Sequence, residues 1–116
     1  MKEDNLIVNK TFEFSLKIIP LYKILTSNKE YVLSKQILRS GTSIGANVEE
    51  AVGAHSKKDF ISKMIIAYKE ARETKYWLRL LDKSQMVKND YSQHLKEVDE
   101  ILNILTAIIK TSKNNS

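Results

Sequence analysis

Hydrophobic residues recur every three or four positions in four segments of the chain, and short polar stretches separate these segments. That spacing places the hydrophobic side chains on one face of an α-helix. It predicts helices over residues of about 5–25, 30–55, 57–82 and 90–111, followed by a polar tail over 112–116. The last four residues of this tail, 113–116, are expected to fray. No segment alternates with a period of two, so the pattern argues against a β-sheet.

The first predicted helix carries a broad apolar face made of two adjoining strips. The members of these strips are Val8, Phe12, Ile19 and Tyr22 on one, and Phe14, Ile18, Leu21 and Leu25 on the other. Pro20 lies inside this pattern and lacks a backbone donor, so we expect a kink there and not the end of the helix. In the second helix, Gly41, Gly45 and Gly53 would each cost about 1 kcal/mol relative to Ala. Close approach of a neighbouring helix is the expected compensation.

Capping residues mark two of the helix starts. Ser56 and Asp59 resemble a capping box at the start of the third helix, and Asn89 or Asp90 is expected to cap the last one. The connections are short, so consecutive helices should run antiparallel. The sequence therefore predicts an all-α protein in which residues 1–116 form a single antiparallel up-down-up-down four-helix bundle.

The third predicted helix has more apolar residues than one core can bury. On a helical wheel, Phe60, Met64, Ala67, Ala71 and Leu78 share one sector, and a second sector lies nearly opposite. A monomer would leave that second sector exposed, so the pattern predicts an oligomer. The predicted interface consists of Ile66, Tyr76, Trp77 and Leu80. The alternative is that these are scattered surface residues, which are common in soluble proteins.

Composition removes several classes of function. The chain has 116 residues, the size of one domain, and no cysteine, which excludes disulfides, thiolate zinc sites, iron–sulfur clusters and cysteine nucleophiles. Its first thirty residues suit neither a signal peptide nor a membrane span, so a cytoplasmic location without a membrane partner is expected. No Glu-x-x-His pair, phosphate loop or nucleophile with a base is present. We therefore expect no enzymatic activity, no metal and no cofactor.

The charge balance permits binding to a polyanion. Lys and Arg number 19 against 14 Asp and Glu, a formal charge of +5. The candidate phosphate-binding residues lie on the second and third helices and are Lys35, Arg39, Lys57, Lys58, Arg72, Lys75 and Arg79. Glu49, Glu70 and Glu73 lie among them, so an ordinary solvated face is the alternative interpretation.

A polar strip beside the core of the second helix is a further candidate site. It consists of Gln36, Ser40, Ser43, Asn47 and Glu50. A buried carboxylate needs a partner, which we expect from Arg39, Arg72 or another subunit. The strip is interpreted either as a structural polar network or as a ligand or partner site.

Three runs of sequence resemble a known family. The runs Leu33–Ala51, Ser56–Phe60 and Ala67–Thr74 resemble the intervening-sequence family, named for reading frames inside insertions in bacterial 23S ribosomal RNA genes. The resemblance covers residues 6 to about 82, with a looser fit beyond. Many relatives carry Arg-Arg and Ser-Ile-Pro where this chain has Leu38-Arg39 and Ser43-Ile44-Gly45.

The resemblance implies a bacterial four-helix bundle that assembles as a ring-shaped homopentamer. A related protein, the accessory variability determinant of diversity-generating retroelements, is a basic pentamer that binds nucleic acid and partners a reverse transcriptase. We therefore expect a non-enzymatic oligomeric scaffold that binds RNA or DNA through backbone phosphates. The alternative is a protein-interaction adaptor with no nucleic-acid role.

Overall fold

The fold consists of four helices. The computed structural model describes residues 2–115, with side chains from residue 5 onward, as α1 (Lys2–Ser27), α2 (Leu33–Val52), α3 (Lys57–Ser84) and α4 (Ser92–Asn114). This described part of the chain contains no β-strand. The all-α prediction is confirmed.

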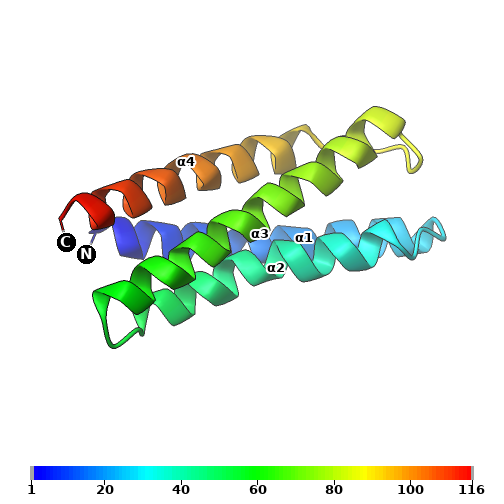
Figure 1. Cartoon of the computed structure of the whole chain (residues 1–116). Coiled ribbons are helices and arrows are strands. Elements are labelled where there is room, and N and C mark those ends of the chain that lie inside the picture. The colour runs from blue at the N-terminus through cyan, green and yellow to red at the C-terminus, as the bar shows by residue number, and fades with distance from the viewer. Residues whose placement is uncertain (1, 116) are drawn as a thin grey trace.

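The helices pack in chain order around one core. Helix α1 packs on α2, α2 on α3 and α3 on α4, and α4 returns along α1. Among the described residues, the backbones of the diagonal pairs α1–α3 and α2–α4 do not come within 8 Å, measured between Cα atoms. Consecutive helices run in opposite directions, and both termini and the α2–α3 turn lie at the same end (Figure 1). The bundle measures 47 × 20 × 19 Å. Each pair of neighbouring helices thus forms one long side of the molecule.

Helix α2 is shorter than the predicted span of 30–55. Its start is set by Glu30, whose buried carboxylate accepts hydrogen bonds from the backbone N–H groups of Val32, Leu33 and Ser34 at 3.1, 3.1 and 2.6 Å. These are donors of the first turn that no residue inside the helix can satisfy. Lys29 turns the chain before it with a positive φ of 63°.

The ends of α3 and α4 follow from local hydrogen bonds. The Ser56 hydroxyl accepts from the backbone N–H of Asp59 at 3.1 Å, which confirms the predicted cap. At the start of α4, the Asp90 carboxylate accepts from the backbone N–H of Ser92 at 2.9 Å. The predicted end of the last helix at about residue 111 was wrong, because α4 continues through Asn114, into the tail that was expected to fray. Residue 116 lies outside the described residues.

The buried side of α1 differs from the predicted face. Ile7, Thr11, Phe14 and Ile18 form the buried stripe, together with Leu21 and Leu25, whereas Phe12 and Ile19 are exposed. A polar residue can occupy the stripe because the Thr11 hydroxyl donates to the carbonyl of Ile7 at 2.7 Å. Phe12 and Ile19, which the periodicity places on the apolar face, therefore lie outside the core. The helix continues through Pro20, which is exposed.

Two glycines lie where α2 packs on α1. Gly41 and Gly45 are buried, and a Cβ atom on Gly45 would lie 3.3 Å from the carbonyl oxygen of Thr11. Such contact with a neighbouring backbone explains why a residue without a side chain stands there. Gly53 is exposed at the end of α2 and has no such neighbour, so the helix-contact explanation was wrong for it.

Candidate nucleic-acid interface

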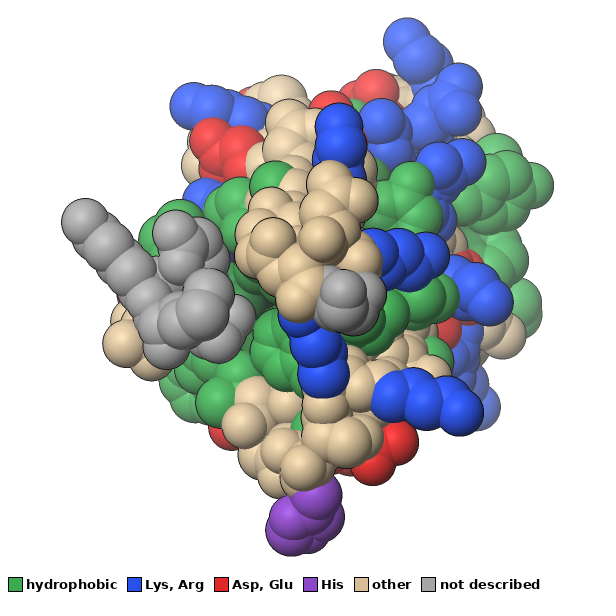
Figure 2. All heavy atoms as spheres, turned by 60° about the vertical axis from the view of Figure 1, so that its left-hand side comes forward, with side chains coloured by type: hydrophobic (Ala, Val, Ile, Leu, Met, Phe, Trp, Pro, Cys, Tyr) green, Lys and Arg blue, Asp and Glu red, His purple; other side chains and the backbone are tan. Residues whose placement is uncertain are grey.

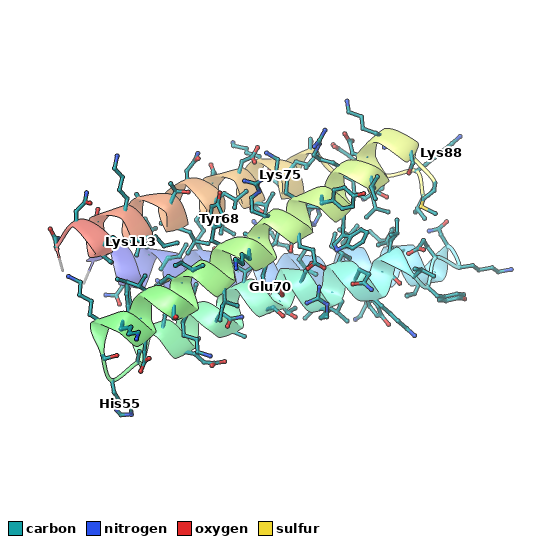
Figure 3. The ribbon with its side chains drawn as sticks, viewed as in Figure 1. His55, Tyr68, Glu70, Lys75, Lys88 and Lys113 are labelled. Atoms are coloured by element: carbon teal, nitrogen blue, oxygen red, sulfur yellow. The ribbon has the colours of Figure 1, made fainter. Side chains whose placement is uncertain are left out.

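A groove of about 620 Å³ runs between α3 and α4. From α3 it is lined by Tyr68, Arg72, Lys75, Tyr76 and Arg79, and from α4 by Asp99, Leu102, Asn103 and Thr106. The α3 residues follow one another at spacings of three and four, so they occupy one side of the helix. Figure 3 shows Tyr68 and Lys75 on the part of α3 that faces α4.

The basic side chains of the groove differ in how they are held. Arg72 donates from Nη1 to the Tyr68 hydroxyl at 3.2 Å, and its guanidinium carbon lies 5.9 Å from the centre of that ring. Lys75 forms an ion pair with Asp99 at 2.8 Å. Arg79 is exposed one turn further along α3. The three cations and one carboxylate leave the groove with an excess of positive charge.

Lys57 and Lys58 lie beside a second hollow near the start of α3. This hollow has a volume of about 340 Å³ and is also lined by Ile61, Ile65 and, from α4, Lys113. It lies between the same two helices as the larger groove. In Figure 2, Lys and Arg side chains gather on one side of the molecule, with hydrophobic side chains between them. The structure thus brings five of the seven predicted basic residues to the α3–α4 side.

Arg39 and Lys35 are not part of this groove. Arg39 extends from α2 to α3, where it pairs with Glu70 at 3.0 Å and with Glu73. The hydrogen bond with Glu73 raises the pKa of Arg39 above its ordinary value. Its charge is already matched by two carboxylates. Lys35 is exposed on α2 and does not line the groove.

Glu73 joins Arg39 to the single tryptophan. It accepts a hydrogen bond from Nε1 of Trp77 at 3.0 Å. This bond, followed by the contacts with Arg39, holds the pKa of the Glu73 carboxyl below its ordinary value. Trp77 is half-buried and also packs against the core.

The predicted polar strip of α2 does not form a network. Ser43 donates to the carbonyl of Arg39 at 2.6 Å, and Asn47 donates from Nδ2 to the carbonyl of Ser43 at 2.8 Å. Glu50 is exposed and pairs with Lys63 at 2.8 Å, and Gln36 is half-buried. Ser43, Asn47 and Glu50 thus find partners on α2 or α3. Arg72, one of the expected partners, bonds instead to Tyr68. Ser40 alone is buried, and it bonds to Thr74 at 2.9 Å.

The second apolar sector of α3 is accessible on the single chain. Ile66 is 41% exposed and Leu80 is 39% exposed. Tyr76 is exposed too, but it lines the α3–α4 groove, and its ring contacts Trp77 edge-on at 5.2 Å between centroids. We therefore define the α3 sector as Ile66, Trp77 and Leu80. The predicted oligomer remains a prediction.

A second apolar surface, on α1, was missed by the sequence analysis. Phe12, Leu16 and Ile19, which we call the α1 strip, are 60%, 53% and 41% exposed. Their spacing of four and three residues places them on one side of the helix. The signal was present in the width of the apolar face predicted for this helix, which already included Phe12 and Ile19.

The described residues show neither a metal centre nor a membrane span. Within residues 5–115, no group of three or more His, Asp or Glu side chains is arranged to hold a metal ion. None of the four helices over that range combines the length and the apolar character needed to cross a membrane.

Two comparisons identify similar proteins. The family model of the 23S rRNA-intervening sequence protein matches residues 3–107. A crystal structure of a protein of unknown function from the S23 ribosomal protein family of Bacteroides thetaiotaomicron is 49% identical, with a TM-score of 0.88. That match covers 93% of this chain and 98% of the other. No curated protein sequence matches the chain.

Proposed function

The chain belongs to the family of 23S rRNA-intervening sequence proteins, and from this premise we propose that it is a non-enzymatic, pentameric ring that binds RNA or DNA through backbone phosphates. Its role would then resemble that of the accessory variability determinant. The α3–α4 groove is the proposed contact surface.

One observation carries this proposal: Arg72, Lys75 and Arg79 converge on one groove and face a single carboxylate, Asp99. Guanidinium groups bind phosphate oxygens through several N–H donors at once. Arg72 and Arg79 are two helical turns apart, about 10.5 Å along the axis, so they can contact different phosphates. Contacts of this kind set affinity and carry no sequence information.

A ring strengthens such contacts. Each copy has a formal charge of +5, which is modest for a nucleic-acid-binding protein. In a ring, five identical grooves act on one polymer, and binding by the first groove raises the effective concentration of the others. Weak contacts in each groove then suffice for tight overall binding.

Retention of duplex RNA and DNA across a range of salt concentrations tests this proposal. Replacing Arg72 and Arg79 by Gln should lower the slope of log K against log salt by about two for each groove engaged. Lys23→Gln with Lys88→Gln is the matched control, because it removes the same charge from exposed residues outside the groove. Equal losses in both variants would show that bulk charge, and not the groove, is responsible. A particle of 13.4 kDa in light scattering would contradict the ring.

A protein-interaction adaptor is the second candidate. It is favoured by exposed apolar side chains at the α1–α2 and α3–α4 turns, namely Tyr31, Val32 and Met86. These turns lie together at the end opposite the termini (Figure 1). A partner that is captured after nuclease treatment, and lost with Tyr31→Ser and Val32→Ser, would support this function instead.

A further inference from the structure

We propose that the α1 strip of one copy packs against the α3 sector of the next copy, so that one heterologous contact is repeated around the ring. The inference deepens the proposed function and rests on its ring. It assigns Phe12, Leu16 and Ile19 a partner of known chemistry: the apolar Ile66, Trp77 and Leu80 of an identical chain.

The contacts of α1 show which side of the bundle its strip occupies. Lys10 and Lys17 reach α4, where they pair with Glu100 at 2.9 Å and with Glu97. Thr11 and Ile18 face the α2 glycines. At about 100° per residue, the α1 strip points away from α4. It therefore lies on the long side formed by α1 and α2.

The contacts of α3 place its sector on a different side. Lys75 faces α4, whereas Glu70, Glu73 and Thr74 face α2, where they bond to Arg39 and Ser40. Ile66 lies four residues before Glu70, and Leu80 lies seven after Glu73, so both belong to the α2-facing edge of the exposed surface. The α3 sector thus lies on the long side formed by α2 and α3.

The side that carries the α1 strip and the side that carries the α3 sector meet at α2. This arrangement favours a contact between the two different surfaces over a contact of one surface with its own copy. One contact that pairs a surface with its own copy covers only one of the two apolar surfaces, and a second, different self-contact would be needed to cover the other. A contact between the two different surfaces covers both on every copy when the ring closes. Neighbouring sides of a four-helix bundle face directions that differ by about 90°. In a closed ring, the directions from one copy to its two neighbours differ by about 90° for four copies and about 108° for five. The arrangement fits a small closed ring.

Each surface lies on a side of the bundle that is large enough to hold an interface of standard size. A long side of the bundle, 47 Å by 20 Å, offers roughly 900 Å², against about 800 Å² per partner in a standard interface. Phe12 and Trp77 provide aromatic anchors of the kind that dominate binding energy. In this arrangement α2 faces the ring axis, and the α3–α4 groove stays open on the outside.

Two charged variants and their mixture test the inference. Leu16→Glu damages the α1 strip and leaves the α3 sector intact, and Leu80→Glu does the reverse. Every contact in the ring uses one of each surface, so each variant alone should be monomeric. An equimolar mixture should form a heterodimer of twice the monomer mass and nothing larger, because only one intact contact can form. Ala107→Glu, an exposed substitution on α4, should leave the wild-type mass unchanged.

Light scattering and sedimentation up to the highest soluble concentration provide the measurement, with circular dichroism to confirm folding. If Leu80→Glu fails to fold, Ile66→Glu takes its place. If the wild type forms a ring, the inference would be overturned by single variants that form homodimers or by a mixture that contains only monomers. A wild-type monomer would overturn both the inference and the ring. Loss of nucleic-acid binding alone would leave the inference intact.

Discussion

A Cβ atom on Gly41 would lie 2.9 Å from Cγ1 of Ile18, closer than carbon atoms approach without displacement. Gly41 belongs to α2 and Ile18 to α1, and both are fully buried. The missing side chain therefore sets how closely these two helices pack.

Gly41→Ala should lower the free energy of unfolding by about 1 kcal/mol. Overpacking a core costs about 1–3 kcal/mol, which exceeds the helix-propensity gain of about 1 kcal/mol from Gly to Ala. Urea denaturation measures the change. Gly53→Ala is the matched control, because its nearest atom would lie 3.7 Å away, and it should not destabilise the chain. A Gly41 variant as stable as the wild type would contradict the tight contact.

The buried hydrogen bond between Ser40 and Thr74 joins α2 to α3. Thr74→Val should cost about 1–2 kcal/mol, because it leaves the Ser40 hydroxyl without its interhelical partner. Ser40→Ala should lower the free energy of unfolding less in the Thr74→Val variant than in the wild type. Thermal or urea unfolding of the wild type, the two single variants and the double variant completes this double-mutant cycle. Additive losses would show that the two hydroxyls do not interact.

The contacts of Glu73 predict a dependence of stability on pH. Its pKa is lowered in the folded chain by hydrogen bonds from Trp77 and then Arg39, so its ionised form stabilises the fold. That contribution is complete above the unfolded-state pKa of about 4.3 and is lost as the pH falls through the lower folded-state value. Denaturation followed by Trp77 fluorescence should show this loss. Glu73→Gln should reduce the dependence of stability on pH in this range. A variant with the same pH dependence as the wild type would show that Glu73 does not contribute to it.

The Asp99 carboxylate neutralises part of the positive charge of the groove. Its carboxylate pairs with Lys75 at 2.8 Å, so Asp99→Asn should free that ammonium group for phosphate and tighten nucleic-acid binding several-fold at low salt. Glu13→Gln makes the same charge change at an exposed position of α1 outside the groove. Retention assays should separate the two variants, and equal affinities would remove Lys75 from the contact surface.

Features fixed by neighbours in the chain were predictable. Ser56 and Asp59 stand three residues apart and define the start of α3 as predicted. The start of α2 was not predictable in this way. The Glu30 carboxylate caps this helix, and it follows a turn in which Lys29 adopts a positive φ. On α1, the buried position next to Phe12 is occupied by the polar Thr11, which hydrophobic periodicity does not register, and Phe12 itself is exposed.

The same distinction applies to the candidate site. Arg72, Lys75 and Arg79 share one helix at spacings of three and four, so the sequence already placed them together. Arg39 was grouped with them although its partners, Glu70 and Glu73, come from a facing helix more than thirty residues away. Which acid neutralises which base depends on helix packing that no local spacing reveals.

The up-down-up-down path gives the bundle two unlike ends. Both termini emerge beside the α2–α3 turn and its labelled His55, and the other two turns occupy the far end. A fluorescent or affinity tag fused to either terminus would therefore lie at one rim of the proposed ring. The opposite rim, with Tyr31, Val32 and Met86, would stay clear for immobilisation or microscopy.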